Sequence, residues 1–355
     1  MGHERLLWWT LAGDAWESAM IEATLEVVEA GGDLSKEAMS EAMGLIMEGR
    51  CQEEEISRLL AALHRKGETV AEVAGAAAAM RRRMTPIRSS RTDTIDVVGT
   101  GGDGSGTFNI STSAALVTAA AGVPVAKHGN RAVTSRSGSS DVLAALGVNI
   151  EADIERVEAC LEELGICFCF APLYHRAMKH VAPVRQKLGT PTIFNILGPL
   201  VNPAGAPFQL LGVGRPGLRP LLAEAIAMLG TRRTLVVHGA DGLDEVSLGE
   251  RTAVSEVSGG TLREFQWTAV DFGLQPAGME TMLVEGPQQS AEVVLGILGG
   301  RTGPPRDIVV VNAAAALWTV GRSDSPIECA RLAAEAIDSG AAKDLLAQLV
   351  RRTHA

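Results

Sequence analysis

The feature that most constrains the fold is a glycine-rich loop between a short apolar run and a helix-like segment. The run 95–98 is typical of a buried strand, and the next eight residues, 99–106, include five glycines. A stretch rich in hydroxyl and amide side chains, 107–112, leads into an alanine-rich helical pattern that ends near Ala121. Glycine lets the backbone approach a ligand with free N–H groups, and a helix N-terminus carries partial positive charge. The stretch therefore predicts a phosphate site at a strand–loop–helix junction.

Taken alone, this loop is a weak signal. It lacks the G-x-x-x-x-G-K-[ST] pattern, and a tight structural turn explains the glycines equally well. Two neighbouring features favour phosphate. The segment N-I-S-T at 109–112 opens a helix, and Lys127 follows the next apolar run, 123–126. Together they predict a phosphate cradle with a cation supplied by a second strand.

Beyond residue 88 short apolar runs alternate with helical patterns, which predicts an α/β fold. The expected strands are 95–98, 123–126, 148–150, 166–170, 210–214 and 235–238. Helical patterns fall at 112–121, 139–146, 154–164, 221–229, 307–320, 327–337 and 342–350. Such alternation favours a largely parallel central sheet flanked by helices, with ligands beyond the carboxyl ends of its strands.

The N-terminal part has a different texture. Helical periodicity begins at Met20, Ser35 is a good N-cap, and Thr69 with Glu72 forms a capping-box pattern. At 355 residues the chain is long enough for two domains. We expect an N-terminal extension at 1–19, a small all-helical domain at 20–88 and a larger α/β domain at 89–355.

The overall charge limits the classes of partner. The net charge of −10 argues against a general nucleic-acid or anionic-membrane surface. Two long uncharged runs, 104–126 and 188–214, are interrupted by polar residues, glycines or prolines, so neither predicts a membrane span. The apolar patch at 6–13 is too short for a convincing signal peptide, and the cysteines show no metal-binding spacing. We expect a cytoplasmic protein with reduced thiols.

A second candidate site follows the expected strand at 235–238. Asp244 and Glu245 are adjacent carboxylates in a glycine-containing loop. Mg²⁺ is commonly held by one or two carboxylates together with substrate phosphates. A solvated acidic turn is the alternative for this segment by itself.

Several long motifs occur together in one order: the glycine loop through N-I-S-T, then KHGNR, SGSSDVLAALG and GLDEVS. In this order the chain resembles the anthranilate phosphoribosyltransferases of tryptophan biosynthesis, over about residues 21–349. The resemblance implies a helical domain, joined by helices from about 173–200, beside an α/β domain. It also implies homodimers through the helical part and Mg²⁺, with two ions per active site. The implied reaction transfers the phosphoribosyl group of phosphoribosyl pyrophosphate (PRPP) to the amine of anthranilate, releasing pyrophosphate.

The same resemblance assigns roles to individual residues. Those expected to bind PRPP are Gly99, Thr100, Gly101, Gly102, Asp103, Thr107, Asn109, Ser111, Thr112, Lys127 and Ser139. Those expected to contact anthranilate are Gly99, His128, Asn130, His175 and Arg185. The expected metal ligands are Ser111, Asp244 and Glu245. A guanidinium suits a carboxylate, so Arg185 would meet that of anthranilate. His128 would assist or orient, and no catalytic base is assigned.

Three positions depart from the family pattern. Arg176 stands where the family commonly has proline, Pro191 where it often has arginine, and Ser140 where it has alanine. None of them removes an expected phosphate or metal ligand, so they bear on the aromatic substrate more than on the reaction.

Two other functions are considered. A pyrimidine-nucleoside phosphorylase would share the architecture, but it favours a KHS-like segment and does not need the Asp244–Glu245 pair. A non-catalytic, nucleic-acid-binding paralogue of the same fold should have a basic surface and a broken metal pair. Neither expectation matches this sequence.

Overall fold

The computed structural model describes residues 3–131 and 137–355, and within the first helix it describes the side chains from Trp16 onward. The chain forms two units. The helical unit runs up to Thr85 and includes His175–Val201, and the α/β unit comprises Pro86–Tyr174 and Asn202–Ala355.

The helical unit is built from amphipathic helices with defined caps. Its helices are α1 (His3–Glu29), α2 (Lys36–Met47), α3 (Glu53–Lys66), α4 (Val70–Arg83), the 3-10 helix η2 (Arg176–His180), α9 (Ala182–Leu188), α10 (Phe194–Leu197) and η3 (Gly198–Leu200). The predicted N-cap is confirmed, since Ser35 accepts from the Ala38 N–H. The capping box of Thr69 and Glu72 is confirmed as well. Helix α1 begins at His3, whereas the sequence pattern indicated helix only from Met20.

The α/β unit is organised around a seven-stranded sheet in the order β3-β2-β1-β4-β5-β6-β7, within the described residues. The strands are β1 (Ile95–Gly99), β2 (Val125–Gly129), β3 (Ile166–Phe170), β4 (Phe208–Gly212), β5 (Arg233–Gly239), β6 (Thr252–Ser258) and β7 (Thr261–Trp267). Strands β1 to β5 are parallel to one another, and β6 and β7 extend the sheet antiparallel from β5. The predicted fold class, a helical domain plus a largely parallel α/β domain, is confirmed.

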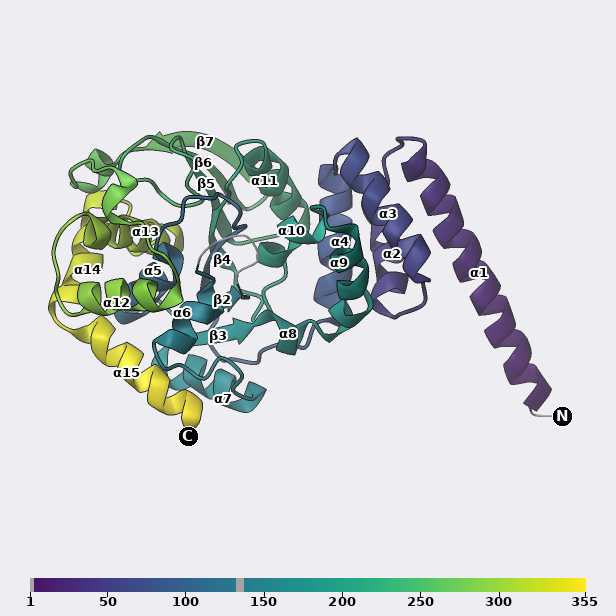
Figure 1. The fold of residues 1–355 in the computed structure, drawn as a ribbon, viewed down its shortest axis with the longest axis horizontal. Coiled ribbons are helices and arrows are strands. Elements are labelled where there is room, and N and C mark those ends of the chain that lie inside the picture. The colour runs from purple at the N-terminus through teal and green to yellow at the C-terminus, as the bar shows by residue number, and fades with distance from the viewer. Residues whose placement is uncertain (1–2, 132–136) are drawn as a thin grey trace. The chain divides into compact units, whose positions relative to one another are not determined.

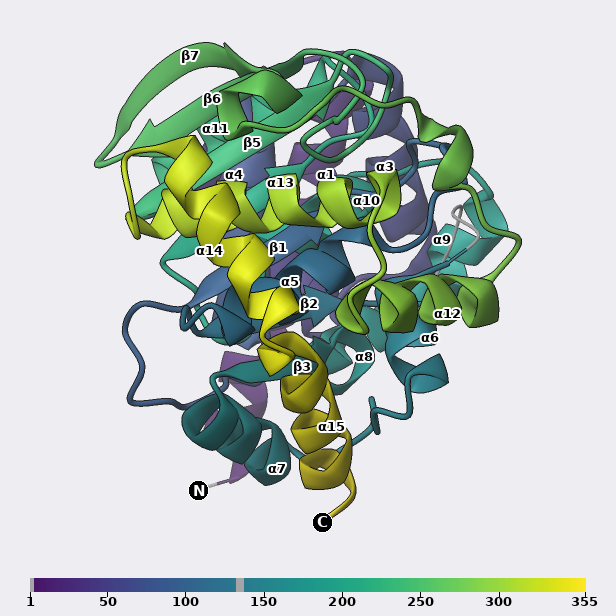
Figure 2. The same cartoon turned by 90° about the vertical axis from the view of Figure 1, so that its left-hand side faces the viewer.

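Helices cover both faces of this sheet (Figure 1). They are α5 (Ile110–Ala120), α6 (Ser139–Ala145), α7 (Ile154–Ala159), α8 (Ala171–Tyr174), α11 (Leu218–Leu229), α12 (Pro287–Leu298), α13 (Pro304–Val320), α14 (Pro326–Asp338) and α15 (Ala341–His354), with η1 (Cys160–Leu164), η4 (Ala269–Phe272) and η5 (Met279–Thr281). Helices α5 and α13 pack on one face and α11 on the other. Figure 2 looks onto the α13 face, where α14 and α15 continue the layer. Buried aliphatic side chains of α13 and of the strands form the core.

The predicted strand at 148–150 is wrong. Val148 and Ile150 are buried, but their segment lies in the turn after α6. The Val148 N–H donates to the Leu143 carbonyl, and the Asn149 N–H donates to Thr353 Oγ1 of α15. The backbone is therefore satisfied locally and by the C-terminal helix, so it is not available to a sheet. Apolar alternation alone could not distinguish these cases.

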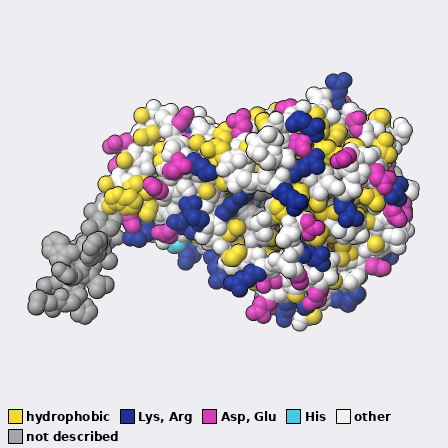
Figure 3. Space-filling model, turned by 180° about the vertical axis from the view of Figure 1, so that it is seen from behind, with side chains coloured by type: hydrophobic (Ala, Val, Ile, Leu, Met, Phe, Trp, Pro, Cys, Tyr) yellow, Lys and Arg dark blue, Asp and Glu magenta, His cyan; other side chains and the backbone are white. Residues whose placement is uncertain are grey.

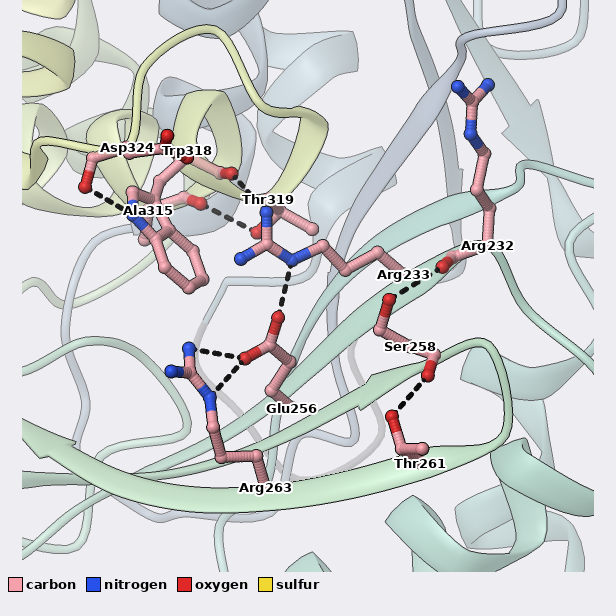
Figure 4. Close-up of polar contacts among 10 residues, drawn as sticks. All are labelled: Arg232, Arg233, Glu256, Ser258, Thr261, Arg263, Ala315, Trp318, Thr319 and Asp324. Carbon is pink, nitrogen blue, oxygen red and sulfur yellow. Dashed lines mark hydrogen bonds and ion pairs between the residues drawn. The ribbon is translucent and has the colours of Figure 1, made fainter.

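The hairpin β6–β7 was not predicted, although Gly259-Gly260 between its strands is a hairpin signal. An ion-pair network joins it to β5 and α13 (Figure 4). Glu256 on β6 accepts from Arg233 Nε at 2.7 Å and from Arg263 Nε at 2.8 Å. The Arg233 guanidinium also lies 3.9 Å from the ring centroid of Trp318 on α13. This network connects the antiparallel edge of the sheet to its helical cover.

Acidic and basic side chains are interspersed on the face of the α/β unit that Figure 3 displays. No described helix is both long and apolar enough to cross a membrane. All five cysteines are free thiols.

Candidate active site

The glycine-rich loop after β1 lies against the loop after β5. Gly101, Gly102 and Gly104 have φ of 67°, 80° and 69°, in the left-handed region that glycine enters without strain. The Gly101 N–H donates to Asp244 Oδ2 at 2.9 Å. A Cβ on Gly99 would lie 2.5 Å from the same carboxylate oxygen, so any larger residue would push the two loops apart. Glycine is thus needed both for backbone conformation and for close approach.

Hydroxyl groups order the remainder of this loop. Thr100 Oγ1 accepts from the Gly214 N–H at 3.3 Å, which ties the loop to the end of β4. Asp103 accepts from the Ser105 N–H at 3.3 Å, and the Ser105 and Thr107 hydroxyl oxygens are 3.1 Å apart.

Helix α5 begins at the end of this loop with a side-chain cap. Asn109 Oδ1 accepts from the Thr112 N–H at 2.9 Å, and the Ser111 hydroxyl donates to the same oxygen at 3.3 Å. The Asn109 N–H donates to the hydroxyl of buried Ser290, a residue with no signal in the sequence. The buried Thr112 hydroxyl has no hydrogen-bond partner among the described residues. This helix N-terminus therefore keeps a polar group free for a ligand.

Lys127 reaches the same place from β2. Its side chain is buried, with 3% exposed, and its Nζ donates to the Val97 carbonyl at 2.5 Å and to Ser111 Oγ at 3.2 Å. Burial lowers the pKa of Lys127, whereas the charges of Asp96, Glu245 and Asp244 raise it. Lys127 therefore lies between the end of β1 and the first turn of α5.

The adjacent carboxylates Asp244 and Glu245 lie at this edge of the sheet, where the positive charge of Lys127 acts on both of them. Burial, and then the charge of Asp103, raise the pKa of Asp244 to about 7. Burial and the charge of Asp244 raise the pKa of Glu245 well above its ordinary value, while Lys127 lowers it. Asp103 adds a third negative charge beside the pair, so the charge of Lys127 does not balance it. A cation would relieve this repulsion, so the pair fits a metal.

The described residues contain no group of three or more histidine, cysteine or acidic side chains arranged to hold a metal. A hard cation here would therefore complete its shell with hydroxyl, water or substrate oxygens, as Mg²⁺ commonly does.

Hydrogen bonds fix the segment that follows Lys127. The His128 N–H donates to Asp96 at 3.1 Å, and the Asn130 carbonyl accepts from the Ser139 hydroxyl at 3.4 Å. The Asn130 side chain accepts from the Arg131 N–H at 2.8 Å. Neither Asp96 nor its contact was expected from the sequence.

The other two expected residues, His175 and Arg185, belong to the helical unit. Burial lowers the pKa of His175 to about 4, so its ring is neutral at neutral pH. Arg185 on α9 donates to Asn195 Oδ1 at 3.3 Å, and its guanidinium lies 5.5 Å from the Phe194 ring centroid.

The α/β unit brings Asp244 against Gly99 and Gly101, and Lys127 against Ser111. The residues that the sequence analysis selected from this unit lie in or after β1, β2 and β5 along the chain. They are Gly99, Thr100, Gly101, Gly102, Asp103, Thr107, Asn109, Ser111, Thr112, Lys127, His128, Asn130, Ser139, Asp244 and Glu245.

Family models match both units. Residues 91–343 match the α/β domain of a glycosyl transferase family, and residues 23–84 match the helical bundle domain of that family. An anthranilate phosphoribosyltransferase of Rhodopirellula baltica is 50% identical over 90% of this chain and 93% of its own length. The corresponding enzyme of Rhodospirillum rubrum is 51% identical over 93% of this chain and 95% of its own.

Solved structures agree with this. Anthranilate phosphoribosyltransferase from Thermus thermophilus superposes with a TM-score of 0.88 at 44% identity, covering 93% of this chain and 99% of the other. The enzyme from Saccharomyces cerevisiae in complex with PRPP and Mg gives 0.86 at 29% identity, covering 95% and 98%. The yeast enzyme is also known with 4-fluoroanthranilate. The chain belongs to the anthranilate phosphoribosyltransferases, the glycosyltransferases of tryptophan biosynthesis that carry an N-terminal helical domain.

Proposed function

We propose that residues at the carboxyl ends of β1, β2 and β5 hold PRPP and Mg²⁺ for the reaction of this family. In that reaction the amine of anthranilate bonds to C1 of PRPP, the bond from C1 to pyrophosphate breaks, and the amine loses a proton. The products are N-(5-phosphoribosyl)anthranilate and pyrophosphate.

One observation carries this assignment: an unmatched acidic pair and a buried lysine meet beside a glycine loop and a helix N-terminus. Lys127, the glycine-rich backbone of the loop and the α5 start suit phosphate oxygens. Asp244 and Glu245 repel phosphate unless a cation lies between them. A metal–polyphosphate complex satisfies both sets of groups at once.

Asp244, Glu245 and Ser111 would hold the metal, which would neutralise the charge that develops on departing pyrophosphate. We propose two ions per site, because two carboxylates and a hydroxyl leave each ion short of ligands that PRPP can supply. Titration of the protein with Mn²⁺ in the presence of PRPP should give a stoichiometry of two, and a stoichiometry of one would contradict this part.

The protein's remaining contribution is positioning. The ribosyl carbon passes through an oxocarbenium-like state, so alignment and electrostatics supply most of the rate. A neutral aromatic amine is already nucleophilic, so no strong base is required. We propose that Gly99, His128 and Asn130 orient anthranilate and that Ser139 serves the pyrophosphate end.

For the helical unit we propose that Arg185 binds the anthranilate carboxylate and that His175, neutral at physiological pH, contacts the aromatic ring. Replacing Arg185 with alanine should raise the KM for anthranilate about tenfold or more while leaving the KM for PRPP nearly unchanged. Equal changes in both constants would contradict this role.

We also propose that the protein forms a homodimer through the helical unit and works in the cytoplasm. The first part is supported by the family resemblance and by exposed Trp16 and Val27 on α1. Five free cysteines fit a reducing compartment. Light scattering should give twice the 37.2 kDa chain mass, and a monomer at micromolar concentration would exclude this dimer.

The reaction is tested with the purified protein, PRPP and Mg²⁺, by following the fluorescence of anthranilate. We expect the fluorescence to fall with time, and to stay constant when Mg²⁺ is removed by a chelator. Loss of uridine in phosphate buffer, with anthranilate unchanged while a known transferase works beside it, would favour the nucleoside phosphorylase alternative.

A further inference from the structure

The sheet is interrupted between its two site-bearing strands. Strand β1 pairs with β4 through five register pairs, and β2 pairs with β3 through five, but β1 and β2 share only the pair Ile95↔Val125. In a regular parallel ladder the following hydrogen bonds would join Val97 to Ala126 and to His128. The ladder therefore stops just before the glycine loop and Lys127.

Side chains replace the missing ladder. Asn202 Nδ2 donates to the Ala126 carbonyl at 2.7 Å, and Lys127 Nζ donates to the Val97 carbonyl at 2.5 Å. The His128 N–H donates to Asp96 Oδ1 at 3.1 Å. Each of these three backbone groups faces the gap between β1 and β2, and each is satisfied by a side chain. We call Asp96, Lys127 and Asn202 the polar wedge.

The polar wedge is buried. Asp96 is 0% exposed, Lys127 3% and Asn202 8%. Burial raises the pKa of Asp96 to about 6, although the Asn202 side chain, the Lys127 charge and the His128 N–H all favour its charged form. Buried ion pairs contribute little net stability compared with well-packed apolar side chains. A continuous backbone ladder would satisfy the same three groups without burying a charge.

The benefit of the wedge lies in what it positions. Lys127 belongs to the polar wedge, and the hydrogen bond to Asp96 fixes His128. Both residues are among those proposed to bind the substrates. We propose that Asp96 and Asn202 are positioning residues that keep β1 and β2 apart at their carboxyl ends and thereby aim Lys127 at the phosphates of PRPP. This inference rests on the proposed function of Lys127.

The first test is Asp96→Asn. The variant keeps a side-chain oxygen for the His128 N–H but removes the charge beside Lys127. We expect PRPP affinity in the presence of Mg²⁺, measured by calorimetric titration, to fall about ten- to a hundredfold, as for loss of a charged hydrogen-bond partner. The KM for PRPP should rise in parallel, while the KM for anthranilate at saturating PRPP changes less than about twofold.

A second variant, Asn202→Ala, leaves both charges in place and removes the donor to Ala126. It should also lower PRPP affinity and raise the KM for PRPP. This variant tests the positioning role if Asp96→Asn does not fold. The matched control is Glu256→Gln, which also removes one buried carboxylate charge but at the β6–β7 hairpin. The control should lower the melting temperature and leave PRPP affinity unchanged.

Folded Asp96→Asn and Asn202→Ala proteins with wild-type PRPP affinity would overturn the inference. So would an equal loss of PRPP affinity in the Glu256→Gln control, because the effect would then be general destabilisation. A wild-type protein that binds no PRPP and consumes no anthranilate would instead refute the proposed function.

Discussion

Acidic side chains lie near both ends of strand β5, but among the described residues only those at its start are paired with arginines. At its start, Glu256 of the neighbouring strand lies between Arg233 and Arg263, with each carboxylate oxygen accepting from a guanidinium (Figure 4). Beyond its carboxyl end, Asp244 and Glu245 repel one another, and burial raises the pKa of both. An acid matched by the fold stabilises the fold, whereas an acid left unmatched is available to a ligand.

The largest expected effect concerns the unmatched pair. Replacing Asp244 and Glu245 together with alanine should lower turnover about a thousandfold or more, because several kcal/mol of charge stabilisation would be lost. The free energy of unfolding should stay the same or increase, since a repulsion is removed. Activity and urea unfolding of one preparation check both, and an unchanged turnover would refute the metal role.

The matched acid should behave in the opposite way. In Glu256→Gln we expect the free energy of unfolding to fall by about 3 kcal/mol, because the partly buried Arg233 keeps its charge without a full counter-charge. Both KM values should stay at their wild-type levels. A Glu256→Gln variant with wild-type stability and altered KM values would show that Glu256 serves the reaction rather than the fold.

The pH dependence of stability should also separate the clusters. The pKa of Asp244 is raised from 3.8 to about 7, so the folded state binds more protons than the unfolded state between these values. Its contribution is therefore most favourable at low pH and is lost as pH rises through 7. Without metal, the stability advantage of Asp244→Asn over wild type should grow by about 2 to 3 kcal/mol between pH 5 and 8.

Urea unfolding of both proteins at the two pH values measures that difference. Saturating Mg²⁺ with PRPP should reduce it, because the bound cation then stabilises the charged carboxylate of the wild type. A difference that does not depend on pH would mean that Asp244 is already matched in the free protein.

The smallest expected effect separates the two arginines of the matched cluster. The Arg263 side chain is 64% exposed, and exposed ion pairs contribute about 0 to 1 kcal/mol. Arg263→Ala should therefore cost roughly 0.5 kcal/mol of unfolding free energy, less than Arg233→Ala, whose side chain also stacks on Trp318. A double-mutant cycle with Glu256→Gln measures each coupling, and a larger coupling for Arg263 would reverse this order.

Local signals in the sequence were reliable where neighbouring residues satisfy one another. The Thr69–Glu72 capping box and the strand at 166–170 were predicted with their observed bounds. The predicted strand at 148–150 is wrong because the backbone partners of this segment lie in α6 and α15 rather than in a strand. The hairpin β6–β7 carried a Gly-Gly turn signal, but its exposed outer strand lacks the apolar pattern that identified the other strands.

The sequence by itself determined the motifs of the site: a glycine-rich loop, a capped helix start, a lysine after an apolar run and an acidic pair. These depend on residues close together in the chain, so their chemistry can be read from spacing. Only the tertiary structure decided which charges are matched and where the sheet opens. Asp96, Lys127 and Asn202 come from separate segments, and burial makes their mutual contacts decisive. Hydrogen bonding and desolvation depend on distance in space, and the order of residues does not record that distance.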